Sequence, residues 1–577
     1  MSSTKFTSEI DGYLEELSRL QVAHWPKEVP TDVVAPLEES TVTGYVREWA
    51  RQRPDHPALA FHGSIVTYAE LDRLSDRVAA YLVDRGAKAG DRAAVMMPNC
   101  PQFIVVFLGI LKAGCVHVPV NPMFRRLEIE YELQDSGARW MFIVDDLAEE
   151  FLAVKATSSI EGVVATNMAD ALVVGAPVPD GVPVDAPPLG GADRYVDVVA
   201  DDSLEVPTDP AQPDALAALN YTGGTTGMPK GCEHSQRDMV YTGVTGGVQN
   251  FAMGPDAVTL VYIPVFWIAG EDGFLLPLMS GGTCVLQYRW DAVEAVQAVE
   301  RHRITVLLGT VDNFLELMDV AARDGKDLSS VETAVTMSFV TKLSEEIRDR
   351  WARESGSPSV LRESSYGMTE DHTLDTFTRG LEVGGLDLTG RPGFTGLPVP
   401  GTQFAVVDFD TGDLVPLGGE GQIVVRSASM MKGYYGRPEA TATTIIDGWL
   451  QTGDSGMIDE RGCLHYLGRR KEMLKVNGMS VFPSELEFAL SRHPDIAASG
   501  VVGIADDAKG ERPLAFVELK PSAVGSVDAE QIRTWCRTNM ATYKVPLVRI
   551  VDAMPLAPTG KVLKSALVDM AAGSGVG

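Results

Sequence analysis

The sequence has few cysteines, too little positive charge to balance its acidic residues, and no long apolar run. Its 577 residues include six cysteines, none in a Cys-x-x-Cys pair, which excludes a disulfide framework and is typical of free thiols in a reducing cytoplasm. Lys and Arg total 49 against 79 Asp and Glu, giving a formal net charge of −30. Because binders of nucleic acids and of anionic membranes need basic surfaces, this charge argues against both classes.

No segment resembles a membrane span or a signal peptide. The longest apolar run, Phe103 to Leu111, is nine residues long, whereas a spanning helix needs about 20, so we expect it to be a core element. Residues 1–20 are charged throughout and lack an apolar centre. Apolar residues make up 45% of the chain, enough for sizeable cores. We therefore expect a cytoplasmic globular protein with no transmembrane segment.

Helical patterns alternate with short Val-, Ile- and Ala-rich runs over residues 41–154 and 216–371, which predicts βαβ units and mostly parallel sheets. Residues 391–467 are rich in Gly, Val, Ile and Asp with turn signals, and predict short strands. The fold class is therefore α/β with several subdomains. We predict a large N-terminal body, residues 1–468, with two α/β sheet subdomains and a β-rich subdomain. A small α+β C-terminal domain, residues 469–577, follows it.

Two other segments and the distribution of charge complete this division. Residues 1–40 are predicted to be an arm with helix around Tyr13–Leu20, and residues 157–213, rich in Asp, Pro, Gly and Val, a loose and partly ordered insertion. Residues 469–577 carry 14 basic and 12 acidic side chains, so the acidity belongs to the N-terminal body, where it favours solubility.

A run of glycines and threonines follows the predicted strand Leu216–Leu219. Residues 221–231 read Tyr-Thr-Gly-Gly-Thr-Thr-Gly-Met-Pro-Lys-Gly. The glycines let the backbone turn tightly and present N–H groups to an anion, and the hydroxyls and the lysine add donors and charge. This chemistry suits a polyphosphate, although the spacing is not that of a Walker A loop. The candidate residues are Thr222, Gly223, Gly224, Thr225, Thr226, Gly227 and Lys230.

The loop resembles the phosphate-binding signature of the adenylate-forming (ANL) superfamily, which includes acyl-CoA synthetases, nonribosomal-peptide adenylation domains and beetle luciferases. Further motifs follow in the order typical of that superfamily and extend the resemblance over residues 41–565. They are Leu111-Lys112-Ala113-Gly114, Val118-Pro119-Val120-Asn121-Pro122, Tyr366-Gly367-Met368-Thr369-Glu370, Gly396-Leu397-Pro398-Val399-Pro400-Gly401, Trp449-Leu450-Gln451-Thr452-Gly453-Asp454, Gly468-Arg469-Arg470-Lys471-Glu472 and Pro558-Thr559-Gly560-Lys561. So many ordered matches identify the chain as a member, in the branch of acyl-CoA synthetases and AMP-dependent ligases.

The resemblance implies how ATP and AMP are bound. Tyr366, followed by Gly367, stacks on the adenine, and Asp454 with Arg469 holds the ribose hydroxyls. Thr369 contacts the α-phosphate, and Glu370 with Thr225 forms the Mg²⁺ site, since magnesium favours carboxylate and phosphate oxygens. The residues with catalytic roles are then Lys561, Lys230, Thr225 and Glu370.

The C-terminal domain supplies the mobile part of the implied mechanism. By resemblance, Lys561 stabilises the charge that develops during adenylation, and Lys471 is the hinge about which this domain rotates. After rotation, Lys475, Asn477 and Gly478 face an incoming thiol, where glycine allows a close approach. Residues 475–479 also fit an ordinary β-turn.

The expected activity is that of an ATP-dependent acyl-CoA ligase. A carboxylate attacks the α-phosphorus of ATP, pyrophosphate leaves, and CoA then displaces AMP from the acyl-AMP. The partners are a small-molecule carboxylic acid, ATP with Mg²⁺, and CoA as co-substrate, and the resemblance also allows a homodimer. The acid is expected to be a hydrophobic monocarboxylic acid: fatty, alicyclic, aromatic or polycyclic. The predicted pocket consists of Phe266, Trp267, Val311, Met337, Ser338 and Phe339.

Two departures from the superfamily pattern concern this pocket. Trp267 stands where many relatives have His, and Met337-Ser338-Phe339-Val340 replaces a Gly-Gly-Ala-Pro stretch. Two alternatives therefore stay open. One is an adenylate-forming enzyme whose acceptor is a carrier protein, an amine or oxygen, for which an amino-acid substrate would need Asp272 or Asp312 as partner of its amine. The other has lost adenylation, because of Trp267, and performs only thioester formation or binding.

Overall fold

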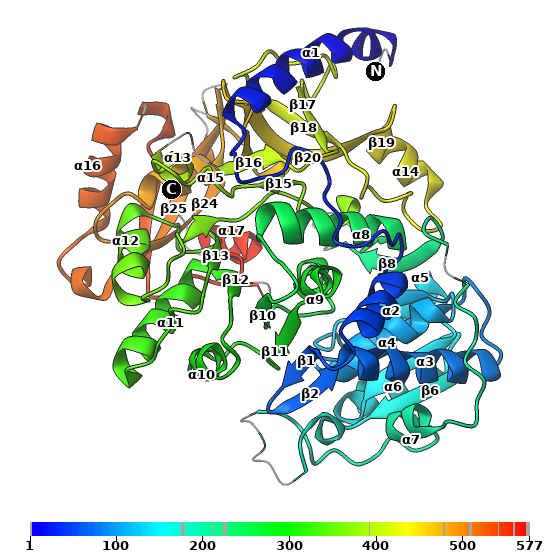
Figure 1. The fold of residues 1–577 in the computed structure, drawn as a ribbon. Coiled ribbons are helices and arrows are strands. Elements are labelled where there is room, and N and C mark those ends of the chain that lie inside the picture. Colours follow the sequence, from blue (N-terminus) through cyan, green and yellow to red (C-terminus); the bar gives the residue numbers. More distant parts are fainter. Residues whose placement is uncertain are drawn as a thin grey trace.

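The computed structural model describes residues 3–174, 178, 181–210, 212–222, 228–389, 391, 393–476, 479–506, 510–540, 542–557 and 560–572. Two seven-stranded sheets with their helices form most of the body. A third, antiparallel sheet lies above them in Figure 1, and a five-stranded sheet with its helices forms the C-terminal unit. This arrangement confirms the predicted class: a large α/β body with a β-rich part and a separate α+β C-terminal domain.

The first sheet has the order β7-β6-β5-β3-β4-β8-β9 and is parallel except for the hairpin of β8 and β9. Every residue of α4 is buried, so the apolar run Phe103–Leu111 is a core element as predicted. The elements are β3 (Arg92–Met96), β4 (Val116–Pro119), β5 (Trp140–Val144), β6 (Gly162–Thr166), β7 (Asp193–Arg194), β8 (Leu216–Tyr221), β9 (Gly231–Ser235), α3 (Tyr68–Asp84), α4 (Pro101–Lys112), α5 (Arg126–Ser136), α6 (Ala148–Lys155) and α7 (Tyr195–Ala200).

The segment 157–213, predicted to be a loose insertion, is partly built into this sheet. Strand β6 pairs in parallel with β5 over its whole length and buries four of its five residues. Strand β7 pairs with β6, and α7 packs against α3. These stretches form the ordered part of the segment, and the short apolar run of β6 lies between stretches rich in Asp, Pro and Gly. The bounds of the insertion stay a prediction.

The second sheet has the order β14-β13-β12-β10-β11-β1-β2, with β2 as its antiparallel edge. Its elements are β1 (Pro57–Phe61), β2 (Ser64–Thr67), β10 (Val258–Val261), β11 (Thr283–Leu286), β12 (Val306–Thr310), β13 (Thr333–Met337), β14 (Arg362–Glu363), α2 (Val42–Gln52), α8 (Gln236–Val244), α9 (Ile268–Ser280), α10 (Ala292–His302), α11 (Val311–Asp324) and α12 (Glu345–Glu354). Of the helices in the described ranges, none combines the length and apolar composition needed to span a bilayer.

The third sheet carries the N-terminal helix α1 across its outer side (Figure 1), where Ile10 and Leu17 are buried against the strands. This helix, Ser3–His24, is longer than the predicted Tyr13–Leu20. The other elements are β15 (Thr376–Phe377), β16 (Phe394–Pro398), β17 (Gln403–Val407), β18 (Gly421–Arg426), β19 (Ile445–Ile446), β20 (Trp449–Ile458), β21 (Leu464–Arg469), α13 (Leu386–Thr389) and α14 (Pro438–Thr444).

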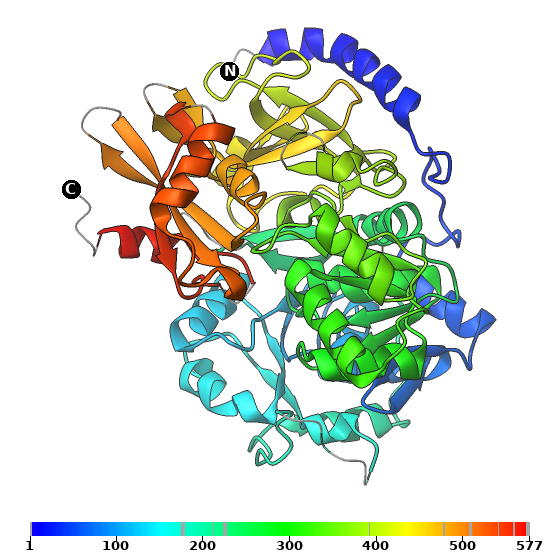
Figure 2. The same cartoon turned by 90° about the vertical axis from the view of Figure 1, so that its left-hand side faces the viewer.

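The C-terminal unit lies against the side of the body, next to the third sheet (Figure 2). Arg492 donates to the Leu388 carbonyl at 3.2 Å, and Lys520 pairs with Glu346 at 3.8 Å. Its elements are β22 (Leu474–Val476), β23 (Met479–Val481), β24 (Ile496–Asp506), β25 (Gly510–Leu519), β26 (Leu547–Val551), α15 (Pro483–Leu490), α16 (Ala529–Asn539) and α17 (Lys564–Ala572). The short helix η5 (Arg470–Glu472) separates β21 from β22. The boundary after residue 468 and the hinge at Lys471 stay predictions.

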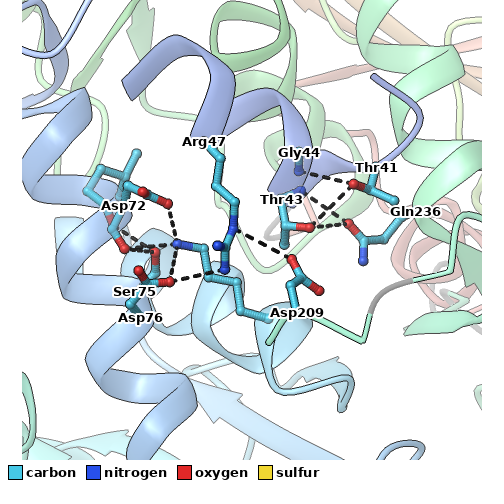
Figure 3. A network of polar contacts seen from close by, with 11 residues as sticks. Thr41, Thr43, Gly44, Arg47, Asp72, Ser75, Asp76, Asp209 and Gln236 are labelled. Carbon is cyan, nitrogen blue, oxygen red and sulfur yellow. Dashed lines mark hydrogen bonds and ion pairs between the residues drawn. The ribbon is translucent and has the colours of Figure 1, made fainter. Parts of the chain in front are cut away.

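An ion-pair network around the buried Lys112 joins the helices beside the first sheet (Figure 3). The ammonium of Lys112 on α4 lies 2.5 Å from Asp72 and 2.8 Å from Asp76, which are one turn apart on α3. Arg47 on α2 reaches Asp76 at 3.2 Å and Asp209 at 3.8 Å. Lys112 thereby links α4 to α3, and Asp76 links both to α2.

Candidate functional site

The glycine–threonine loop connects β8 to β9. The strands pair antiparallel up to Tyr221 opposite Gly231. The Thr222 N–H donates to the Lys230 carbonyl at 3.0 Å, and the Lys230 N–H donates to Thr222 Oγ1 at 3.2 Å, so these two residues close the loop at its base. Residues 223–227, which include the predicted phosphate ligands Gly223, Gly224, Thr225, Thr226 and Gly227, lie outside the described residues.

Tyr366, Asp454 and Arg469 lie in direct contact. Strands β20 and β21 place Asp454 opposite Arg469 in register, and the Arg469 Nε lies 2.8 Å from Asp454 Oδ1. The Tyr366 hydroxyl donates to Asp454 Oδ2 at 2.6 Å. Burial raises the pKa of Asp454 to about 6, although Arg469 and the tyrosine hydroxyl favour its ionised form. A carboxylate held on both sides in this way is a fixed acceptor for a pair of hydroxyls.

Thr369 and Glu370 belong to the short helix η4 (Thr369–Asp371). Glu370 Oε1 accepts from the Tyr434 hydroxyl at 2.8 Å, and the Lys230 ammonium lies 3.9 Å from the centroid of the Tyr434 ring. Burial and the neighbouring Glu370 raise the pKa of Tyr434, so its hydroxyl stays a donor. Tyr434 thus connects the lysine of the loop to the candidate magnesium ligand. The sequence analysis missed this residue, because it lies in none of the quoted motifs.

Lys561 brings a positive charge from the C-terminal unit to the body. Its ammonium lies 4.9 Å from the centroid of the Phe339 ring, which is on the segment after β13. Although the residue as a whole is exposed, desolvation of its ammonium and the nearby guanidinium of Arg469 lower the pKa of Lys561, against the opposing charge of Asp454. The charges of Arg469 and Asp454 therefore both act on the ammonium of Lys561.

Comparisons with known proteins agree with this geometry. The family described as AMP-binding enzyme matches residues 46–435, and its C-terminal domain matches residues 485–561. The chain belongs to the AMP-binding enzyme family. Within the adenylate-forming superfamily it falls in the acyl-CoA ligase branch, whose curated members include its relatives.

Two of these relatives are long-chain-fatty-acid–CoA ligases. That of Bacillus subtilis (strain 168) is 28% identical over 95% of this chain and 97% of its own length, and that of Escherichia coli O6:H1 is 31% identical over 96% and 99%. Among solved structures, the anthranilate CoA ligase AuaEII in complex with anthranoyl-AMP superposes with a TM-score of 0.78 and 25% identity. The match covers 92% of this chain and 98% of that one.

The predicted pocket residues of this AMP-binding enzyme fall into three places. The rings of Phe266 and Trp267 pack edge to face just before α9, with their centroids 5.5 Å apart. Val311 is fully buried at the start of α11, in the apolar core around Phe314 and Trp351. Met337, Ser338 and Phe339 lie in the third place, the segment 337–340 at the end of β13. Assignment of these residues to an acyl pocket stays a prediction.

The segment 337–340 faces the C-terminal unit. Ser338 donates through its N–H to Glu363 Oε1 at 3.0 Å and through its hydroxyl to Glu363 Oε2 at 2.6 Å. Phe339 lies beneath the Lys561 ammonium, and Val340 packs against the apolar cluster of the C-terminal unit that includes Phe516. Phe339 and Val340 therefore contact the domain that carries Lys561.

The predicted hinge and CoA-facing residues lie at the start of the C-terminal unit. Lys475 lies in β22 and Lys471 in η5, and their side chains are outside the described part of the structure. Asn477 and Gly478 lie outside the described residues altogether. Their roles stay predictions.

A buried acid–histidine cluster adjoins the site and was not predicted. His372 follows η4, and its ring lies between Glu271, 3.3 Å from Nε2, and Asp272, 3.5 Å from Nδ1, all three side chains being buried. Burial alone lowers the pKa of His372, but Asp272 and Glu271 raise it to about 10. Burial raises the pKa of Asp272 to about 6. Asp272 therefore already has an internal cation as its partner.

Proposed function

We propose that the protein is an ATP-dependent acyl-CoA ligase that activates a hydrophobic monocarboxylic acid as acyl-AMP and transfers the acyl group to CoA, releasing AMP and pyrophosphate. The observation that carries the proposal is the direct contact of Tyr366, Asp454 and Arg469, which come from three motifs of the family. The ammonium of Lys561, from the C-terminal unit, meets the body at the Phe339 ring. The ligase names of the relatives support the proposal.

The described side chains suit the two ends of a nucleotide. Asp454, fixed by Tyr366 and Arg469, accepts the ribose hydroxyls. Lys230 and Lys561 supply positive charge, and a cation near the reacting carboxylate and phosphate stabilises the charge that develops as the new bond forms.

The donor set fits a magnesium ion. Glu370 offers a carboxylate held in place by Tyr434 beside the Lys230 side of the loop, and magnesium prefers oxygen ligands of this kind. Glu370 and Thr225 would hold the ion, which when bound would neutralise phosphate charge. In this chain, the hydrogen bond from Tyr434 holds the Glu370 carboxylate in one orientation for the ion.

Several observations narrow the class of acid substrate. Asp272 is paired with His372, and Asp312 accepts a hydrogen bond from Thr341 at 2.5 Å, so both carboxylates that a substrate amine would need already have partners. The aromatic pair of Phe266 and Trp267 favours an apolar acid. A cytoplasmic location is consistent with six cysteines that are all buried and unpaired. The homodimer stays a prediction.

The test is a panel of carboxylic acids incubated with ATP, Mg²⁺ and CoA and read by mass spectrometry for thioesters. A parallel reaction without CoA contains hydroxylamine, which traps acyl-AMP as a hydroxamate. We expect both products from at least one hydrophobic acid. Hydroxamate without thioester would identify a different acceptor, and the absence of both products from every acid would refute the proposal.

Lys561→Ala separates the half-reactions. Removing the cation is expected to lower acyl-AMP formation by about 10²- to 10³-fold, while thioester formation from supplied acyl-AMP persists. If wild-type protein forms thioester only from supplied acyl-AMP, the alternative in which Trp267 prevents adenylation is supported. Trp267→His would then be tested for recovery of acyl-AMP formation.

A further inference from the structure

The backbone directly after Thr369 and Glu370 adopts an unusual conformation. His372, Thr373 and Leu374 are consecutive non-glycine residues with φ of 57°, 54° and 58°. Left-handed backbone is unfavourable for such residues, and it is rarest for a β-branched residue such as threonine. A turn of this kind persists only where its surroundings hold it.

The turn packs closely against the nucleotide-binding segment. A Cβ at Gly367 would lie 2.5 Å from the Leu374 nitrogen and 2.6 Å from the Thr373 Cα, so the two stretches of backbone are in direct contact. The Thr373 N–H donates to the Met368 carbonyl at 2.9 Å, and the Asp375 N–H donates to the Tyr366 carbonyl at 2.9 Å. A shift of the turn would therefore displace Met368 and the two residues after it. Tyr366 is also anchored elsewhere, because its N–H donates to Thr376 Oγ1 at 2.7 Å and its hydroxyl donates to Asp454.

His372 fixes the turn to two elements of the body. Its ring is held between Glu271 and Asp272, both in the first turns of α9. Glu271 in turn accepts from the Asn220 side chain at 2.7 Å, and Asn220 lies in β8, the strand that leads into the glycine–threonine loop. The His372 ring thus connects the residue after η4 to α9 directly, and to β8 through Glu271.

A second histidine supports the same segment. His234 on β9 is fully buried, with its ring 5.0 Å from that of His372 and edge to face with it. Its Nε2 lies 2.7 Å from the Thr369 carbonyl oxygen. The backbone of Thr369 is therefore held from the side of the hairpin, while His372 holds the turn that follows.

We propose that His372 is a positioning residue: clamped by Glu271 and Asp272, it holds the left-handed turn 372–374 and so orients Thr369 and Glu370 toward the phosphates and metal of a nucleoside triphosphate. This inference rests on the proposed function, which assigns those two residues their ligands. The clamp is not itself a metal site, since the described residues contain no group of three or more His, Cys, Asp or Glu side chains arranged to hold a metal ion.

The decisive experiment compares two ligands by calorimetry. Adenosine uses only the Tyr366, Asp454 and Arg469 end of the site, whereas Mg·ATP also needs Thr369 and Glu370. For His372→Gln we expect the Kd of Mg·ATP to rise about 10- to 100-fold, the magnitude typical when a residue that orients a ligand-binding side chain is lost. The Kd of adenosine should change less than about twofold, and the KM for Mg·ATP should rise more than kcat falls.

The matched control is His465→Gln. His465, in β21, is also a buried histidine beside a carboxylate, 3.2 Å from Asp459, and its ring packs edge to face on that of Phe394. We expect it to lower thermal stability and to leave both affinities unchanged. If His372→Gln does not fold, Asp272→Asn, which keeps the size of the clamp and removes its charge, is measured in the same way.

The outcomes separate the two proposals. If wild-type protein binds Mg·ATP no better than adenosine, the proposed function fails. If wild-type protein binds Mg·ATP more tightly than adenosine, and His372→Gln or Asp272→Asn keeps the same ratio of affinities, the positioning role of His372 is refuted. Equal losses for both ligands would also refute it, because they would indicate general damage to the fold.

Discussion

Two buried cations are each held between two carboxylates, and they have different neighbours. Lys112 joins α4 to Asp72 and Asp76 on α3, among helices beside the first sheet. His372 joins the end of η4 to Glu271 and Asp272 on α9, two residues after Glu370. Both replace water around a charge with ion pairs, at a desolvation cost that such pairs rarely recover in full. The difference is that the backbone of His372 continues into the candidate nucleotide site.

The comparison indicates that burial and pairing do not by themselves define a functional residue. Lys112 belongs to a motif of the family, yet its described contacts explain only how helices are held together. His372 belongs to no motif recognised in the sequence, yet its contacts reach the segment that carries Thr369 and Glu370. We therefore expect loss of Lys112 to lower stability and loss of His372 to lower affinity for the triphosphate.

The largest effect is expected for Lys112→Met. The substitution leaves Asp72 without its cation and Asp76 with Arg47 alone, and breaking an ion pair with a buried partner in this way costs about 3–5 kcal/mol. Native-state hydrogen exchange should show that loss in the opening free energy of amides in α3 and α4. The Kd of adenosine and Mg·ATP should be unchanged in molecules that remain folded.

Lys326→Met is the control for this variant. Lys326 pairs with Glu300 at 2.8 Å, but both side chains are more than a third exposed. Exposed pairs contribute about 0–1 kcal/mol, so little loss is expected. Equal losses for the two lysine variants would show that Lys112 is not the structural clamp that its contacts imply.

Tyr434→Phe examines the site from the side of the loop. The ring beneath Lys230 is kept, but Glu370 loses a hydrogen bond, and bonds to a charged group contribute about 1.5–3 kcal/mol. We expect the Mg²⁺ concentration at half-maximal acyl-AMP formation to rise about tenfold. Tyr68→Phe, which removes a buried hydroxyl bonded to the Gly282 carbonyl at 2.8 Å, should lower stability alone. If Tyr434→Phe leaves the Mg²⁺ dependence unchanged, the hydroxyl of Tyr434 does not position Glu370 for magnesium binding.

Part of this site was predictable because its pairing is local in the fold. The motifs containing Asp454 and Arg469 lie on neighbouring strands of one hairpin, whose register places them opposite each other. The loop from Thr222 to Lys230 was likewise expected to follow a strand, and it lies between β8 and β9.

The remaining contacts depend on packing between distant elements. His372 meets Glu271 across 101 positions of sequence, and Tyr434 meets Glu370 across 64. No local pattern of residues encodes either contact. Phe339 was assigned to the acyl pocket from its alignment alone, whereas its position beneath Lys561 depends on how the C-terminal unit docks.

The pH dependence of adenosine binding separates two carboxyl groups whose pKa lies near 6. Asp272 is paired in the interior, whereas Asp454 faces the expected ribose and must lose its proton to accept two hydroxyls. Because burial raises the pKa of Asp454 to about 6, the binding form grows as pH rises and is about a tenth of the protein at pH 5. Adenosine affinity should rise roughly tenfold from pH 5 to pH 7. Calorimetry on Asp454→Asn should show weak binding with no such rise, and a flat wild-type profile would contradict the assignment.

The smallest effect is expected for Phe339→Leu, which concerns the exposed lysine Lys561, whose ammonium lies over the Phe339 ring. A cation above an aromatic ring gains about 0.5–2 kcal/mol, so losing the ring should slow acyl-AMP formation about two- to tenfold for every acid. Phe339→Tyr should retain the rate, and thioester formation from supplied acyl-AMP should be unchanged in both. A change in the ranking of acids with no change in the overall rate would instead place Phe339 in the acyl pocket. Because one outcome is uniform across acids and the other is selective, the same acid panel decides whether the ring acts on the lysine or on the substrate.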